Sequence, residues 1–108
     1  MKTKVIFRKY RGGTVIALFP EVPTDGMGEL CVLQSLTVKN SVDGFKTFSN
    51  TLPASPYEYQ ELKEKLENMG YTLVICEKWD YEMSKIRREA AFAMKPKTKD
   101  VLSGLRLK

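Results

Sequence analysis

Few residue types in this 108-residue chain are suited to covalent or metal chemistry. Histidine, the usual acid or base near neutral pH and the commonest metal ligand, is absent. The two cysteines, Cys31 and Cys76, lie far apart in the sequence, whereas a zinc site needs four ligands at short spacing. Each lies in an apolar β pattern and lacks the cationic neighbours that favour a thiolate. We therefore expect two reduced core thiols, no metal, no cofactor and no enzymatic activity.

Carboxylates and glycine-containing loops offer little more. Catalysis by a pair of carboxylates needs no histidine, but no two acids are brought together by spacing alone. The sequence RGG at 11–13 occurs in RNA-binding tails, yet a single copy between two β runs predicts a hairpin turn. DGMGE at 25–29 lacks the further oxygen ligands of a calcium loop and the Lys-Ser/Thr of a phosphate loop. An ordinary solvated loop is expected there.

The last third of the chain combines aromatic and basic residues. Residues 78–108 hold nine Lys or Arg and four Asp or Glu, which accounts for the whole formal charge of +5, because residues 1–77 hold nine of each sign. Aromatic residues among basic ones are what single-strand nucleic-acid binders use. The candidate contact residues are Lys78, Trp79, Tyr81, Lys85, Arg87, Arg88, Lys95, Lys97 and Lys99. The alternative is that these aromatic residues complete a small core beneath a solvated basic helix.

The elements that would position these residues begin with strands. β-branched and aromatic residues at 3–10 and 14–19 predict a hairpin around 11–13, with its second strand central in a sheet. Two prolines and two glycines at 20–29 predict a loop. A third strand is expected over 30–38, a turn over 40–44, a weak extended segment over 45–52 and a final strand over 71–79.

Two helices are predicted in the second half of the chain. Ser55, Pro56 and Glu58 form a capping-box pattern, and apolar residues then recur at helical spacing up to Gly70, which predicts a helix over 56–69. Asp80 can cap a second helix over 81–94, which Pro96 ends. Its apolar stripe is narrow, so this helix is expected to bury less apolar surface than the helix over 56–69. It is less certain to belong to the core and is a candidate appendage.

These elements predict an α+β fold: a small antiparallel sheet with one helix packed on a face, plus a C-terminal basic helix. The length fits one compact domain, divided into a core over 1–79 and a basic helix and tail over 80–108. No apolar run is long enough to span a membrane, and the apolar part of the N-terminus is too short for a secretory signal. A cytoplasmic location is expected.

Several runs of the sequence resemble a known group of proteins. The runs are KVIFRKY at 4–10, VIALFPEVP at 15–23 and PASPYEY at 53–59, followed by Leu62 and by Gly70 with Tyr71. Over residues 4–78 the chain is similar to short uncharacterised proteins encoded by bacterial phages and other mobile elements. The resemblance implies a fold and a genomic context, and it brings no activity with it.

Two functional hypotheses follow. The first is a non-catalytic binding module whose basic C-terminal segment contacts nucleic acid or a nucleic-acid-handling protein. The second is a protein-interaction inhibitor of a host defence or regulatory protein, which the resemblance and the lack of catalytic residues favour. A homodimer through the helix over 81–94 is a further possibility, with Met83, Ile86, Ala90 and Met94 as its contact stripe.

Overall fold

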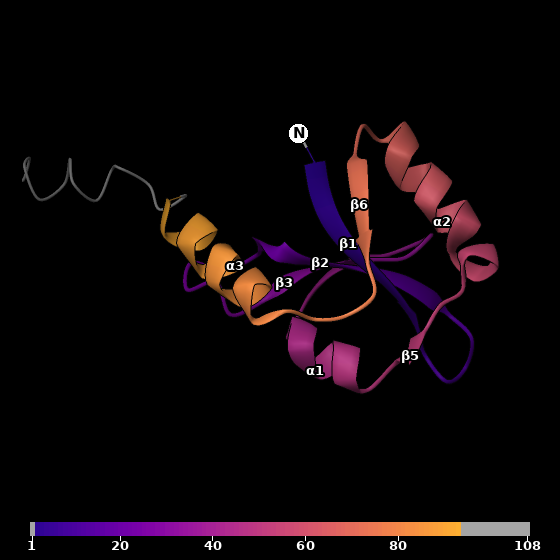
Figure 1. Ribbon diagram of the computed structural model, residues 1–108, viewed down its shortest axis with the longest axis horizontal. Helices are drawn as coiled ribbons and strands as arrows, with labels where there is room; N and C mark the ends of the chain where they lie inside the picture. The colour runs from indigo at the N-terminus through magenta and orange to yellow at the C-terminus, as the bar shows by residue number, and fades with distance from the viewer. Residues whose placement is uncertain (1, 94–108) are drawn as a thin grey trace, which may run out of the picture.

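A six-stranded sheet forms the centre of residues 2–93, the part of the chain that the computed structural model describes (Figure 1). Its strands are β1 (Lys2–Lys9), β2 (Val15–Pro23), β3 (Cys31–Gln34), β4 (Lys39–Val42), β5 (Leu52–Pro53) and β6 (Thr72–Cys76). The helices in that range are α1 (Gly44–Ser49), α2 (Pro56–Asn68) and α3 (Tyr81–Ala93). The predicted α+β fold with a small antiparallel sheet is confirmed.

One edge of β1 is divided between two strands. The order β4-β3-β2-β1 is antiparallel throughout, so the predicted hairpin and the central position of its second strand are confirmed. On the other side of β1, β6 runs parallel to residues 2–6, and β5 pairs antiparallel with Arg8 and Lys9. β5 and β6 therefore separate from each other near Phe7.

Alternate strand residues face two hydrophobic clusters, one on each side of the sheet. One cluster joins the sheet to α2 and contains Val5, Phe7, Ala17, Phe19, Val32, Leu62 and Leu66. The other joins it to α3 and contains Ile6, Ile16, Leu18, Leu33 and Met83, with Phe48 of α1 and Trp79 packed against it. The result is three layers, with α2 on one face and α1 and α3 on the other (Figure 1).

α2 begins as its sequence predicts. The Ser55 hydroxyl accepts a hydrogen bond from the Glu58 amide at 3.3 Å, and the Glu58 carboxylate accepts one from the Ser55 amide at 2.9 Å. Pro56 occupies the first turn, where its missing N–H costs nothing. After the helix, Gly70 has φ of 105°, a left-handed conformation that glycine adopts without strain.

The prediction of an extended segment over 45–52 is wrong for its first residues, because Gly44–Ser49 form the helix α1. The Asp43 carboxylate accepts a hydrogen bond from the Lys46 amide at 3.1 Å and caps the helix. Gly44 is buried at the start of α1, where a Cβ atom would lie 2.4 Å from the Trp79 ring and 2.6 Å from the Cys31 sulfur. This close approach is a tertiary contact, so the local pattern gave no sign of it.

The strand boundaries differ from prediction at two places. β2 continues through Pro20 to Pro23, where a loop was expected. The pairing of β2 with β3 shifts register between Phe19 and Pro23, so the sheet does not need the N–H groups that the prolines lack. The strand expected over 30–38 ends at Gln34. A turn at Ser35, whose hydroxyl accepts from the Val38 amide at 3.0 Å, then leads into β4 in place of the expected turn over 40–44.

α3 belongs to the core, and its expected role as an appendage is wrong. Met83, Arg87 and Ala91, spaced four residues apart, are buried, and α3 packs across β2. The predicted stripe shared only Met83 with this face, and Ile86 is 37% exposed. The helix therefore covers the sheet with a different face from the one that the apolar pattern indicated.

Candidate functional site

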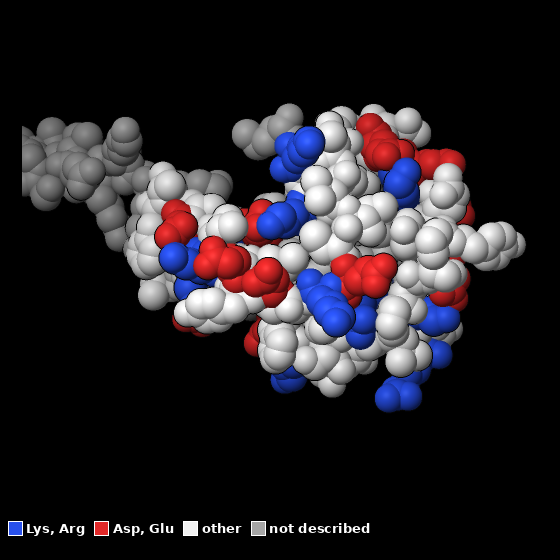
Figure 2. Space-filling view, viewed as in Figure 1, with Lys and Arg blue, Asp and Glu red and all other residues white. Residues whose placement is uncertain are grey.

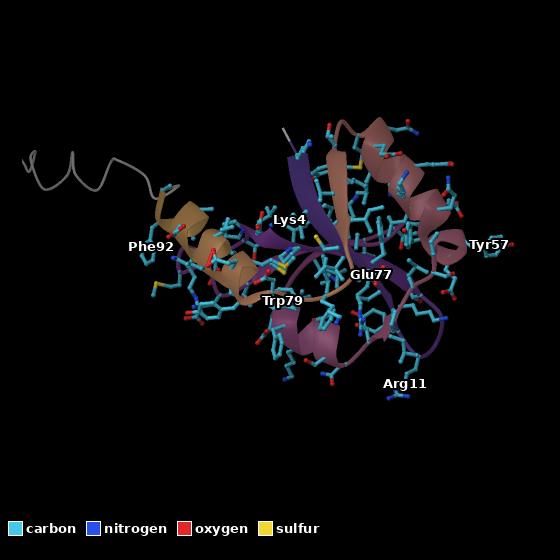
Figure 3. All side chains as sticks on the ribbon, in the orientation of Figure 1. Lys4, Arg11, Tyr57, Glu77, Trp79 and Phe92 are labelled. Atoms are coloured by element: carbon cyan, nitrogen blue, oxygen red, sulfur yellow. The ribbon has the colours of Figure 1, made fainter. Side chains whose placement is uncertain are left out.

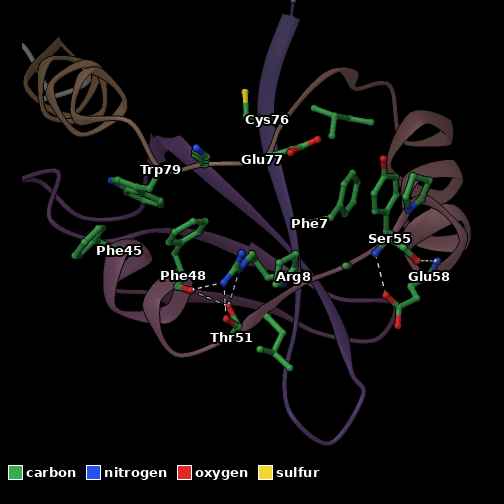
Figure 4. Close-up of a pocket in the computed structure, with 17 residues that line it drawn as sticks. Phe7, Arg8, Phe45, Phe48, Thr51, Ser55, Glu58, Cys76, Glu77 and Trp79 are labelled. Carbon is green, nitrogen blue, oxygen red and sulfur yellow. Dashed lines mark hydrogen bonds between the residues drawn. The ribbon is translucent and has the colours of Figure 1, made fainter.

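A groove of about 920 Å³ opens where β5 and β6 separate from β1 (Figure 4). Its floor is the end of β1, and α1 with the segment linking β6 to α3 forms one wall. The start of α2 and the short β5 form the other. Two strands pairing with different stretches of one edge leave a gap in the sheet, and side chains from five elements surround it.

The walls of the groove are largely aromatic. Phe45 and Trp79 meet edge to face with ring centroids 6.2 Å apart, and Phe48 lies 6.3 Å from Trp79. Phe7, at the end of β1, stacks on Tyr59 of the opposite wall with ring centroids 4.1 Å apart. Phe45 is 58% exposed although it contacts Trp79. The exposed ring of Phe45 therefore offers apolar surface beside the groove.

Arg8 lies at the floor of the groove and is only 8% exposed. Its Nε donates to the Thr51 hydroxyl at 3.1 Å, and its Nη2 donates to the carbonyls of Phe48, at 2.9 Å, and of Thr51 (Figure 4). The guanidinium carbon lies 4.1 Å from the centre of the Phe48 ring. Burial lowers the pKa of Arg8 from its ordinary value.

The polar contacts of Arg8 are all with neutral groups. Among residues 2–93, no carboxylate lies within ion-pair distance of Arg8, and its Nη1 donates no hydrogen bond. The buried guanidinium thus retains its charge without a counterion in the described part of the chain and keeps donor capacity at the groove floor.

The acids and bases around the groove differ in how far they are already paired. Glu58 forms an ion pair with Lys9 at 2.5 Å and closes the capping box of α2. The Lys9 hydrogen bond, followed by that from the Ser55 amide, lowers the pKa of Glu58. Lys78 and Glu77 lie on the segment after β6 and are both exposed. Among the described residues that line the groove, Glu77 is thus the one acid without an ion pair, and the cations are Arg8 and Lys78.

The structure brings two of the predicted contact residues to the groove, Lys78 and Trp79. Tyr81 is 76% exposed at the start of α3, and Lys85 and Arg88 are exposed farther along that helix. Lys95, Lys97 and Lys99 lie outside the described residues.

Arg87 is buried, and its prediction as a surface contact residue is wrong. It is 5% exposed, donates from Nε to the Gly28 carbonyl at 2.7 Å and from Nη1 to the Pro20 carbonyl at 2.9 Å, and lies 5.6 Å from the centre of the Trp79 ring. These contacts fasten α3 to the end of β2 and the loop that follows. Arg87 therefore has a structural role.

The described part of α3 and the segment before it do not form a basic surface. The exposed bases Lys78, Lys85 and Arg88 are accompanied by exposed Asp80, Glu82 and Glu89. Figure 2 shows Lys and Arg (blue) intermingled with Asp and Glu (red) over this helix. Residues 94–108 carry five bases and one acid, so most of the surplus of positive charge comes from residues outside the described range.

Sequence reasoning missed Arg8, Phe45 and Phe48 as site residues. Arg8 occupies the same strand face as Ile6, and a charged residue at an inward-facing position of a β pattern is a signal that the sequence did contain. Phe45 and Phe48 were placed in an extended segment, and their proximity depends on α1. No local pattern predicted that they would face Trp79.

Burial disfavours the thiolate form of both cysteines. Burial raises the pKa of Cys31 to about 11, against a smaller opposing effect of the Arg87 charge. Cys76 is half-buried, and burial likewise raises its pKa. Both thiols are free, and the prediction of a buried core thiol is confirmed for Cys31. Among the described residues, no three His, Cys, Asp or Glu side chains gather in the way that a metal ion requires.

None of the helices in residues 2–93 combines the length and apolar character needed to cross a bilayer. Comparisons with protein-family models, curated proteins and solved structures found no match to this chain. The site must therefore be interpreted from its own geometry.

Proposed function

We propose that this protein is a non-catalytic binding module that holds an extended peptide segment of a protein partner in the groove. The observation that carries the proposal is an aromatic groove at a divided sheet edge. Within the described residues β6 pairs only with β1, so its outer edge offers backbone groups to an added strand. Exposed aromatic residues beside such an edge supply the pockets that give peptide binding its specificity.

The charge distribution favours a peptide over a nucleic acid at this place. Glu58 and Glu77 line the groove together with Arg8 and Lys78. Because Glu58 is paired with Lys9, the cations Arg8 and Lys78 exceed the remaining acid, Glu77, by one charge. One surplus positive charge does not match a nucleic-acid strand, which brings a phosphate with every nucleotide, whereas it suits a peptide with few charges. An inhibitor of a host defence or regulatory protein is the role that the resemblance to phage proteins suggests for such a module.

A displayed library of random 12-residue peptides tests this proposal. We expect the wild-type protein to enrich peptides with a shared motif. Phe45→Ala should weaken their binding at least tenfold, about 1.4 kcal/mol, because it removes the exposed ring of the groove. Tyr57→Ala is the matched control, since Tyr57 is 93% exposed and points away from the groove (Figure 3). The absence of a motif, or equal effects of the two variants, would contradict the proposal.

Nucleic-acid binding is the second candidate, favoured by the exposed ring of Tyr81 near Lys85 and Arg88, with Lys95, Lys97 and Lys99 following in sequence. Retention of single- and double-stranded nucleic acid at two salt concentrations tests it. Phosphate contacts predict a steep loss of affinity with salt and a weaker slope after the double change Lys85→Ala with Arg88→Ala. No retention at low salt, or an unchanged slope, would exclude this candidate. Arg87 is left out because its replacement would disturb α3.

The predicted homodimer and cytoplasmic location stay predictions. Met83, the first residue of the proposed dimer stripe, is buried in the protein's own core, while Ile86 is partly exposed and Met94 lies outside the described residues. Light scattering of the full chain, compared with an Ile86→Glu variant, tests the dimer. A dimer through this helix should dissociate in the variant, and an unchanged mass would exclude that contact.

A further inference from the structure

We propose that the groove recognises a carboxylate flanked by an aromatic or apolar side chain, as in an acidic peptide segment, with Arg8 receiving the carboxylate. This inference rests on the function proposed above and specifies the chemistry of its partner. It begins with the position of Arg8, which shares a sheet face with Ile6 at the edge of the cluster formed by Ile16 and Leu18. Apolar residues normally occupy such positions, because a buried charge without a counterion is costly.

The contacts of Arg8 hold its guanidinium in place without neutralising it. Nε and Nη2 are engaged by Thr51 and the Phe48 carbonyl, and the Phe48 ring covers the group at 4.1 Å. These contacts fix the plane of the guanidinium. Nη1 remains with two N–H groups, and Arg8 is among the residues that line the groove. A carboxylate that reached this floor would meet an oriented cation in a partly desolvated site, where charge-assisted hydrogen bonds are strongest.

The surroundings of Arg8 define the rest of the ligand. Lys78 adds a second cation on the segment after β6, while Glu58 is already paired with Lys9. A single negative charge is therefore attracted, and repeated negative charges would meet Glu77. Phe45 and Trp79 offer apolar surface on one wall, which a side chain next to the carboxylate would cover. An anion and an apolar group side by side match the groove better than either alone.

The sole tryptophan of the chain, Trp79, lies in the groove and reports on binding by its fluorescence. The probes are 3-phenylpropanoate, its neutral analogue 3-phenylpropanamide, and phenyl phosphate. We expect the carboxylate to perturb Trp79 with an affinity about tenfold higher than the amide and higher than phenyl phosphate. Equal affinities for carboxylate and amide, no response to the carboxylate, or tighter binding of phenyl phosphate would overturn the inference.

Variants locate the effect. Lys78→Ala should reduce carboxylate affinity several-fold, and Arg8→Lys, which keeps a charge but not the planar fork, should remove most of the preference over the amide. Lys85→Ala, an exposed base outside the groove, is the matched control. Arg8 donates to a carbonyl of α1, so a melting curve is needed to show that Arg8→Lys is folded. If that variant is unfolded, the loss of carboxylate affinity in Lys78→Ala tests the inference. A carboxylate preference that survives Lys78→Ala and Arg8→Lys in folded protein contradicts the assignment.

The outcome is separable from that of the peptide library. Peptides that enrich and depend on Phe45 but show no need for an acid would refute only the carboxylate inference. A response to 3-phenylpropanoate without any enriched peptide would refute peptide binding and leave a small-molecule carboxylate site.

Discussion

Arg8 and Arg87 are buried arginines with different surroundings. Both lie beside an aromatic ring, and both donate to backbone carbonyls; among the described residues neither has a carboxylate partner. Arg87 uses Nε and Nη1 to join two chain segments that lie about sixty residues before it in the sequence. Arg8 lines the groove, and Arg87 does not. Arg87 therefore stabilises the packing of α3, whereas Arg8 is a candidate ligand contact.

At the residue scale, Cys31 is expected to resist thiol reagents. Its pKa is raised to about 11, so the thiol stays protonated at pH 8, and the side chain is fully buried. With iodoacetamide at pH 8, Cys76 should be labelled and Cys31 should react only after denaturation, as read by peptide mass mapping. The Cys76→Ser variant is the control, and it should show no labelling when folded. Rapid labelling of that variant would mean that Cys31 is accessible.

At the element scale, the helices depend on contacts of different range. α2 is held at its start by a capping box formed within four residues. α1 and α3 depend on residues far away, because α1 needs the space that Gly44 leaves for Trp79 and α3 needs the carbonyls that Arg87 reaches. Gly28 shows the same dependence. A Cβ atom there would lie 2.6 Å from the Cα of Arg88, so the loop and α3 meet at van der Waals distance.

Replacing Arg87 should destabilise the fold far more than replacing its neighbour. Arg87→Met leaves the carbonyls of Gly28 and Pro20 without donors and should reduce the free energy of unfolding by roughly 2 kcal/mol or more. Arg88→Met changes an exposed side chain and should alter it by less than about 0.5 kcal/mol. Urea denaturation of the two variants checks this. Similar values would show that the Arg87 contacts do not anchor α3.

The cap of α2 should make stability depend on pH. The pKa of Glu58 is lowered in the folded protein, chiefly by its hydrogen bond to Lys9, so its contribution is present above the unfolded pKa and is lost as pH falls through the folded pKa. Glu58→Gln should therefore be less stable than wild type at pH 7, and the difference should shrink below about pH 4. Thermal unfolding across this range measures it. Glu61→Gln, on an exposed position of the same helix, is the control, and a pH-independent difference for Glu58→Gln would contradict the prediction.

At the scale of the whole molecule, the groove exists because distant parts of the chain meet beside β1. Its lining comes from β1, α1, β5, the start of α2 and the segment after β6. Gly44 does not line the groove, but it packs against Trp79, which does, and against Cys31 of β3. A change at Gly44 should therefore reach the groove through Trp79.

Gly44→Ala is predicted to destabilise the protein by about 1–3 kcal/mol and to shift Trp79 emission, because the added methyl would overlap the indole ring. Peptide binding in the groove should weaken with it. Gly12→Ala is the matched control, since a Cβ atom there meets nothing within 4 Å. Fluorescence spectra and urea denaturation of both variants measure the effect, and unchanged Trp79 emission in Gly44→Ala would show that the wall is not rigidly coupled to α1.

The elements whose signals are local can be predicted from the amino-acid sequence. The hairpin follows from runs of β-branched and aromatic residues on either side of two glycines, and α2 follows from Ser55, Pro56 and Glu58, because turns and caps are satisfied within a few residues. Long-range contacts, in contrast, account for the helix over 44–49, for the burial of Arg87 and for the position of Arg8 in a groove with Phe45 and Trp79. Each of these depends on the space and the hydrogen-bond acceptors provided by residues distant in sequence, which no local pattern encodes.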